Sequence, residues 1–208
     1  MGCEPNGFRR PGCVGEANPH ALVIYIPDPL AKFLDDLRRE LIQHCNPHAH
    51  VTILPPRALA GSLGEALQQA GAAAPLFPPF DIEAGRIETF DQTNVIYIGI
   101  ERGASELKAM HNMLNTGALA AAERFTYHPH LTIAQDFDPA DMDRFQALAE
   151  ERWAGWRGPR TFHAETVTFV QNTVDSCWRD LAAFALGRRP DSGSRTQEPA
   201  TQTTQSVP

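Results

Sequence analysis

The chain has 208 residues, 42% of them hydrophobic and 21% charged, a balance typical of a folded soluble protein and not of a disordered chain. Its length predicts one domain, or two small lobes that share a core. The apolar run at 21–26 is far too short to cross a bilayer, so we expect no membrane association. The net charge of −7 excludes an extended basic surface for long nucleic acids, but a small site can still bind one or two phosphates.

The cysteines and the two ends of the chain indicate the compartment and the extent of the fold. The four cysteines lie far apart without a Cys-x-x-Cys pair, which argues against a zinc ribbon or a disulfide framework. The N-terminal residues lack the apolar core of a secretory signal, so we expect a cytoplasmic protein with reduced thiols. Residues 1–19 and 188–208 are polar and predicted to be disordered tails around a folded part at 20–187. Nothing in the pattern predicts an obligate protein partner, and we expect a monomer.

The first half of the folded part alternates between strand and helix signals. A capping Asp28 followed by Pro29 predicts the start of one helix, and a capping box of Ser62 and Glu65 predicts the start of another. Strands are expected at 21–26, 50–54 and 80–90, and helices at 28–41 and 62–70.

The second half repeats this order. Apolar residues at helical spacing predict a helix within 105–121, and a second pair of cap and proline, Asp138 and Pro139, predicts the start of another at 138–153. The strands of this half are expected at 94–101, 130–134, 161–170 and 177–186, the last two as a hairpin.

Two short sequences occur once in each half. The string VIYI stands at 23–26 and at 95–98, and the string His-x-His-x-Thr-Ile stands at 48–53 and, 80 residues later, at 128–133. The chain contains only 8 histidines, so two copies of this longer string are not expected by chance. The repeat predicts two similar lobes related by a pseudo-twofold axis, the first with the motif at 48–53 and the second with the motif at 128–133.

The period of a β-strand brings the polar residues of each motif together. Alternate residues of a strand point to the same face, so His50 and Thr52 share one face, as do His130 and Thr132. The apolar residues between them then point into the core. If the lobes face each other, two imidazoles and two hydroxyls surround one small ligand.

This set of groups suits displacement at phosphorus without a metal. Because imidazole titrates near neutral pH, one ring can take a proton from water while the other donates a proton to the leaving oxygen. Threonine hydroxyls can donate hydrogen bonds to the phosphoryl oxygens. We therefore expect His50 and His130 to be catalytic, Thr52 and Thr132 to bind the phosphate, and no cofactor or metal to be needed.

Two other classes of function remain open. His48 with His50, and His128 with His130, could present metal ligands at alternate strand positions, as in a zinc hydrolase. Against this, the next position on the same face is a threonine in both copies, and threonine is a poor zinc ligand. The other alternative is a nucleotide- or RNA-binding module without catalytic activity.

These residues resemble the 2H phosphoesterase superfamily, and specifically its bacterial 2′-5′ RNA ligase and RNA 2′,3′-cyclic phosphodiesterase group. That superfamily has two His-x-Thr/Ser motifs, here His50-Val51-Thr52 and His130-Leu131-Thr132, and the flanks HVTILPPR and HPHLTIAQ are also similar. The resemblance covers about residues 20–187.

The resemblance implies a bilobal α+β fold in which two antiparallel sheets form a central cleft with helices on the outside. It also implies hydrolysis of 2′,3′-cyclic phosphates to 2′-phosphates on RNA ends, short oligonucleotides or cyclic nucleotides, and some members join RNA through 2′-5′ linkages. By motif position, His50 and His130 correspond to the acid–base pair, and Thr52 and Thr132 to the phosphate-binding residues. Which histidine is the acid is left open.

Four further residues are candidates for the cleft. His48 and His128 share a face with the catalytic pair, but a place at the strand edge explains them equally well. Tyr127 could stack on a base, or it could pack in the core. Arg57 could bind a phosphate, or it could be a solvated loop residue.

Overall fold

The structure is a computed structural model that describes residues 19–42, 48–90, 92–172 and 178–187. The tails predicted at 1–19 and 188–208 lie outside the described residues, except for Pro19. Across the described ranges, no helix is long and apolar enough to cross a membrane.

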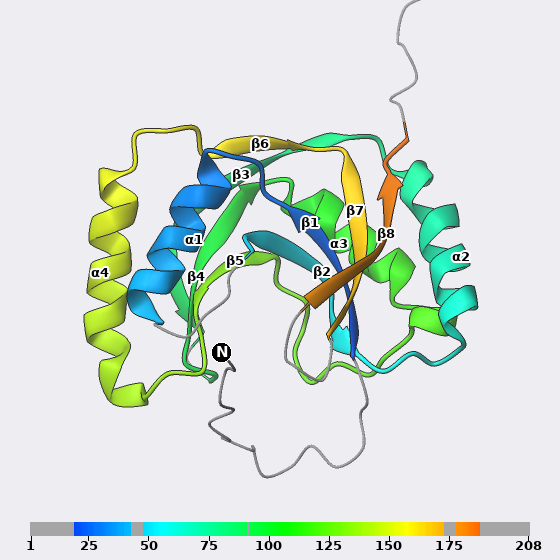
Figure 1. The fold of residues 1–208 in the computed structure, drawn as a ribbon, viewed down its shortest axis with the longest axis horizontal. Helices are drawn as coiled ribbons and strands as arrows, with labels where there is room; N and C mark the ends of the chain where they lie inside the picture. Colours follow the sequence, from blue (N-terminus) through cyan, green and yellow to red (C-terminus); the bar gives the residue numbers. More distant parts are fainter. Residues whose placement is uncertain (1–18, 43–47, 91, 173–177, 188–208) are drawn as a thin grey trace, which may run out of the picture.

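Within the described residues, eight strands form two four-stranded antiparallel sheets (Figure 1). The first sheet has the order β2 (His50–Arg57), β1 (His20–Tyr25), β7 (Thr166–Asn172) and β8 (Trp178–Ala185). The second sheet has the order β5 (His130–Ala134), β4 (Val95–Arg102), β3 (Phe80–Phe90) and β6 (Thr161–Ala164). The edge strands β2 and β5 contact each other, so the two histidine motifs meet in the middle of the molecule (Figure 1).

In the part of the chain that the structure describes, four α-helices cover the outer faces of the sheets, and they interlock the two halves of the sequence. The pair α1 (Leu30–Leu41) and α4 (Met142–Gly155) lies against the second sheet, and the pair α2 (Leu63–Ala73) and α3 (Ala104–Leu114) lies against the first (Figure 1). Each motif strand is therefore supported by a helix from the other half of the chain. The predicted α+β architecture is confirmed, but its lobes are not successive segments of sequence.

The strand predicted at 161–170 is in fact two strands in different sheets. β6 ends at Ala164 and β7 begins at Thr166, so the chain passes from the second sheet to the first at Glu165. The residues that belong to the main hydrophobic core change phase there, from Phe162 and Ala164 to Val167 and Phe169, whereas Val170 is buried in a separate small cluster. Because a single strand keeps its inward residues two apart, this change requires a break. The predicted hairpin is confirmed for β7 and β8.

The helix predicted at 105–121 ends at Leu114. Asn115 leaves the helical conformation, and its side-chain oxygen accepts hydrogen bonds from Arg57 Nη1 at 2.6 Å and from the Ala121 amide at 2.9 Å. Gly117 has a φ of +53°, a conformation that favours glycine. Contacts across the fold thus convert the end of the predicted helix into a loop that runs to the second motif.

The VIYI repeat does not occupy matching positions in the two sheets. Tyr25 pairs with His50 across β1 and β2, whereas His130 pairs with Gly99 across β5 and β4, and Tyr97 pairs with Thr132. The second copy is therefore shifted by two residues relative to its motif strand. The surroundings of the two histidines differ for this reason, although the motifs themselves are alike.

Candidate active site

The two motifs begin two edge strands and divide their residues between two faces as predicted. Val51, Ile53, Leu131 and Ile133 are all 0–1% exposed and belong to the core. The four polar residues between them, His50, Thr52, His130 and Thr132, are partly exposed. Burial of the apolar residues fixes each strand's register, and this register presents the imidazole and hydroxyl of each motif on one face.

Both catalytic candidates have the same hydrogen bond. Nδ1 of His50 lies 2.6 Å from the carbonyl oxygen of His48, and Nδ1 of His130 lies 2.7 Å from that of His128. A carbonyl can only accept, so in each ring Nδ1 carries the proton and donates. In the neutral imidazoles, Nε2 then has the free lone pair, which is the state a general base needs.

Burial lowers the pKa of both histidines. The pKa of His50 falls from 6.5 to about 4, mainly through loss of hydration; the hydrogen bond to the His48 carbonyl opposes this fall, and the nearby charge of Arg38 adds to it. The pKa of His130 is also lowered, again mainly by burial. Burial therefore favours the neutral form of both rings.

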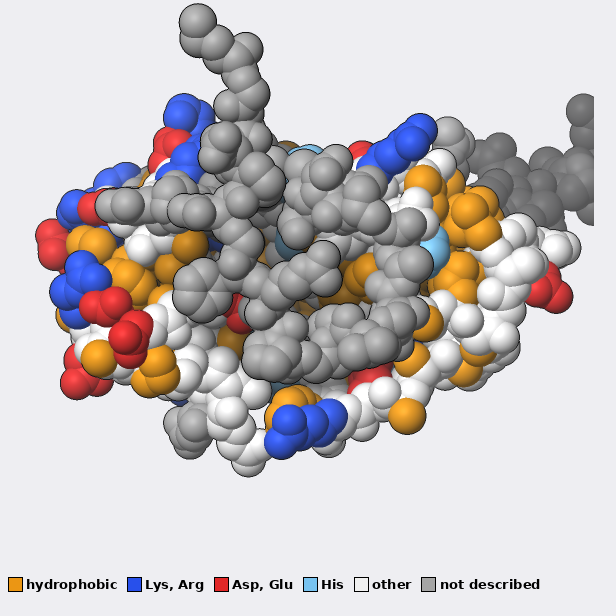
Figure 2. Space-filling view, turned by 60° about the horizontal axis from the view of Figure 1, so that its bottom comes forward, with side chains coloured by type: hydrophobic (Ala, Val, Ile, Leu, Met, Phe, Trp, Pro, Cys, Tyr) orange, Lys and Arg blue, Asp and Glu red, His pale blue; other side chains and the backbone are white. Residues whose placement is uncertain are grey.

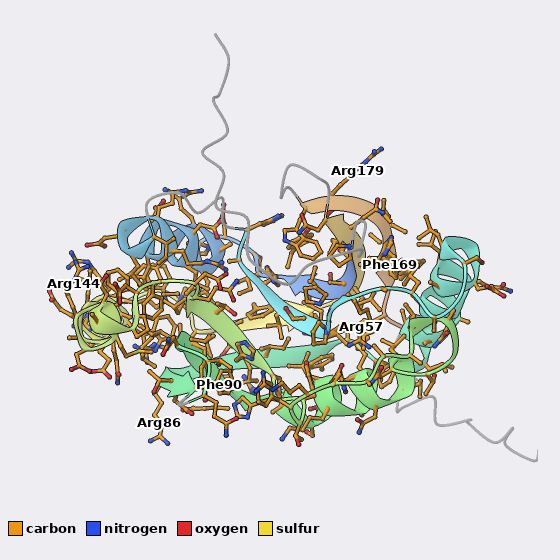
Figure 3. All side chains as sticks on the ribbon, turned by 90° about the horizontal axis from the view of Figure 1, so that it is seen from below. Arg57, Arg86, Phe90, Arg144, Phe169 and Arg179 are labelled. Carbon is orange, nitrogen blue, oxygen red and sulfur yellow. The ribbon has the colours of Figure 1, made fainter. Side chains whose placement is uncertain are left out.

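A cavity of about 1150 Å³ adjoins the motifs. The strands contribute Thr52, His130 and Thr132, and further walls come from the end of β3 with Phe90 and from the segment 120–127. His50 and His48 lie outside this lining, next to Tyr25 of β1. Figure 3 shows Arg57 beside β2 and Phe90 beside the second sheet. The volume is ample for a nucleotide, since cavities that hold small ligands occupy roughly 300–1000 Å³.

The side chains of His48 and His128 have different neighbours. The His48 ring stacks on Tyr25 with centroids 3.8 Å apart. The His128 ring lines the cavity and meets Phe90 and Tyr97 edge to face at 5.5 and 5.6 Å. Both residues also supply the carbonyl that orients the ring of His50 or His130, a role that any residue type can fill.

Arg57 is held by protein groups. It is 6% exposed, and its guanidinium forms an ion pair with Glu123 and donates to Asn115 Oδ1 and to the carbonyl oxygens of Leu119 and Pro55. Four of the five N–H groups are used in these contacts. Arg57 thus ties β2 to the segment after α3, which leaves little of its guanidinium for a phosphate.

Tyr127 packs on a histidine that the sequence alone did not single out. Its ring lies parallel to that of His111 with centroids 4.0 Å apart, and its hydroxyl donates to the carbonyl oxygen of Thr52 at 2.8 Å. The stacking face nearest the core is therefore occupied by His111. A signal for His111 did exist, because it lies among Leu107, Met110 and Leu114 on the buried face of α3.

Metal ligands were the alternative use of the histidine pairs. Among the residues that the structure describes, no group of three or more His, Cys, Asp or Glu side chains is arranged to hold a metal ion.

Two similar proteins come from Bacillus cytotoxicus and Oceanobacillus iheyensis. A protein of Bacillus cytotoxicus, provisionally named a phosphoesterase, is 25% identical over 158 residues, which are 64% of this chain and 91% of the relative. A protein of Oceanobacillus iheyensis with the same kind of name is 27% identical over 120 residues, 49% of this chain and 70% of its own.

Solved structures share the fold. The crystal structure of E. coli LigT complexed with NADP+ has a TM-score of 0.59 at 17% identity and covers 84% of this chain and all of its own. The complex of LigT with 3′-AMP has a TM-score of 0.55 at 18% identity and covers 83% of this chain and all of its own.

The family model described as the 2′-5′ RNA ligase superfamily matches residues 26–176, a range that contains both histidine motifs and most of the folded part. Together with the two sheets and the paired motifs, this match confirms the resemblance seen in the sequence, and the chain belongs to the 2′-5′ RNA ligase superfamily of 2H phosphoesterases.

Proposed function

We propose that the protein is a metal-independent phosphodiesterase that hydrolyses the 2′,3′-cyclic phosphate ends of RNA or nucleotides to 2′-phosphates. The observation that carries this proposal is the identical state of the two motif histidines. Each is fixed through Nδ1 to the carbonyl two residues earlier and so has Nε2 available, and each has a threonine on the same strand face.

The reaction needs one base, one acid and donors for the phosphate. One neutral imidazole takes a proton from water, whose oxygen attacks phosphorus. The P–O3′ bond breaks, and the second imidazole, protonated, gives its proton to O3′. The product is a 2′-phosphate with a free 3′-hydroxyl. The hydroxyls of Thr52 and Thr132 donate to the non-bridging oxygens, where negative charge builds up.

The same groups account for ligation. If the 5′-hydroxyl of a second RNA replaces water as the nucleophile, an identical displacement leaves a 2′-5′ phosphodiester and a free 3′-hydroxyl. The proposal therefore extends to 2′-5′ RNA ligase activity, which is the same chemistry with a different acceptor.

Charge favours short or terminal substrates. On the part of the face in Figure 2 that the described residues form, Lys and Arg side chains lie in small separate groups among Asp and Glu. Such a surface does not track a long phosphate backbone. E. coli LigT has been crystallised with phosphate, ATP, 3′-AMP and NADP+, which supports a nucleotide-sized ligand for this chain.

The test is turnover of a short RNA that ends in a 2′,3′-cyclic phosphate, in excess EDTA, with and without an RNA acceptor carrying a 5′-hydroxyl. We expect hydrolysis without the acceptor and a 2′-5′ joined product with it. Activity that returns only on addition of zinc or manganese would favour the metal hydrolase. Tight binding of the RNA without turnover would favour the binding module.

The threonines are expected to matter through charge-assisted hydrogen bonds. Thr52→Val or Thr132→Val keeps the side-chain shape and removes a bond to phosphate worth about 1.5–3 kcal/mol, so we expect kcat/KM to fall roughly 10- to 100-fold. Steady-state kinetics on a cyclic mononucleotide measures this. Wild-type rates in both variants would remove the threonines from the phosphate site.

The lowered pKa values place the pH optimum of kcat/KM on the acid side. This parameter reports the free protein, where the reaction needs one neutral and one protonated histidine. The pKa of His50 is about 4, and that of His130 is lowered from 6.5. The coupled pair therefore gives a bell-shaped pH profile of kcat/KM with its maximum between pH 4 and 6.5. The optimum of kcat should lie higher, because a bound phosphate anion raises the pKa of an imidazole. A kcat/KM that rises to a plateau above pH 7 would contradict this assignment.

A further inference from the structure

A polar network is buried beneath one of the two motif strands. Helix α3, which packs on β2, has His111 among its buried residues. Helix α1, which packs on β5, buries four residues, all of them leucine. Burial of a polar side chain costs free energy unless it is hydrogen-bonded, and the buried His111 is hydrogen-bonded to β2.

The network holds the backbone of the first motif at two consecutive residues. Nδ1 of His111 lies 2.8 Å from the carbonyl oxygen of Ile53, to which it donates. The hydroxyl of Tyr127 donates to the carbonyl oxygen of Thr52, also at 2.8 Å. The rings of His111 and Tyr127 are parallel within 1°. The stack therefore fixes the position of the phenol that binds Thr52.

The same network anchors the wall of the cavity. Nε2 of His111 lies 3.2 Å from Glu123, whose other oxygen pairs with Arg57 of β2. Glu123 and Tyr127 belong to the segment that lines the cavity. Burial raises the pKa of Tyr127, so its hydroxyl keeps its proton and remains a donor throughout the working pH range. The cavity wall and the motif strand are thus fixed to each other.

We propose that Tyr127 is a positioning residue, whose hydroxyl holds the Thr52 backbone so that the Thr52 hydroxyl meets the phosphate in the geometry of the transition state. The inference rests on the proposed function, because it takes Thr52 as a phosphate-binding residue. Small displacements of groups around a reacting centre reduce rates strongly, so loss of this bond is expected to lower kcat/KM about 10-fold.

A double-mutant cycle tests the proposal, with Thr132 as the matched control. Tyr127→Phe keeps the stacked ring and removes one hydroxyl. We expect this substitution to lower kcat/KM for 2′,3′-cyclic AMP about 10-fold in the wild-type background and in the Thr132→Val background. In the Thr52→Val background we expect a loss of less than about twofold, because two substitutions that act through the same group do not have additive effects. Equal losses in both threonine backgrounds, or an unchanged rate in Tyr127→Phe alone, would overturn the proposal.

Binding of the product separates this inference from the proposed function. Calorimetric titration with adenosine 2′-monophosphate requires no turnover, and the same cycle is expected there: weaker binding on Tyr127→Phe in the Thr132→Val background but not in Thr52→Val. If the wild type binds this nucleotide and hydrolyses no cyclic phosphate, the proposed function fails while the cycle still decides the role of Tyr127. If the wild-type protein does not bind adenosine 2′-monophosphate, both the proposed function and the role of Tyr127 are contradicted.

Discussion

Replacing either His50 or His130 by alanine is expected to lower kcat for a 2′,3′-cyclic nucleotide by about 100-fold or more, since a positioned acid or base contributes roughly 10²–10⁴ to the rate. Each ring is held by a bond of 2.6 or 2.7 Å between Nδ1 and a carbonyl, and the second ring cannot act at once as acid and base. The double variant should therefore be little slower than either single variant, because the two residues work as one unit.

The control for this experiment is His163→Ala. His163 is an exposed residue of β6 whose Nδ1 lies 2.8 Å from Asp81, and it lies outside the cavity lining. We expect the His163→Ala variant to have the kcat of the wild-type protein. Full activity in either His50→Ala or His130→Ala would contradict the assignment of that residue.

Replacing Arg57 by methionine is expected to lower the free energy of unfolding by about 3 kcal/mol, the usual cost of removing one partner from a buried ion pair. Its side chain is 5% exposed and that of Glu123 is 19% exposed. Methionine keeps the apolar stem but leaves Glu123, Asn115 Oδ1 and the Leu119 carbonyl without this donor. Urea unfolding followed by tryptophan fluorescence measures the change.

Two further variants sharpen this result. Arg86→Met removes an arginine whose side chain is 85% exposed, and it should change stability by less than about 0.5 kcal/mol. Arg57→Met combined with Glu123→Leu should be more stable than Arg57→Met alone, because no carboxylate is then left without its partner. A stable Arg57→Met protein with a raised KM would instead show that Arg57 binds the phosphate.

The sequence predicted those parts of the candidate site that depend only on the two-residue alternation of side chains along a β-strand. A strand repeats every two residues, so the alternation of His50, Val51, Thr52 and Ile53 was enough to place imidazole and hydroxyl on one face and the apolar residues in the core. The Ser62–Glu65 capping box is equally local, and the structure contains both of its hydrogen bonds.

The parts that the sequence did not predict depend on contacts between distant segments. Just after the end of α3 at Leu114, Asn115 accepts a hydrogen bond from Arg57, which lies 58 residues away in the sequence. The passage between sheets at Glu165, and the packing of α1 on β5 of the other half, follow from how the two halves interlock. The lowered pKa of both histidines likewise requires their burial in the folded protein.

The most direct test of the central claim is ³¹P NMR of 2′,3′-cyclic AMP incubated with the protein in excess EDTA. We expect the wild type to produce a single new signal, that of adenosine 2′-monophosphate, and His50→Ala and His130→Ala to produce none in the same time. A 3′-monophosphate product, or turnover that appears only after a divalent metal is added, would contradict the account.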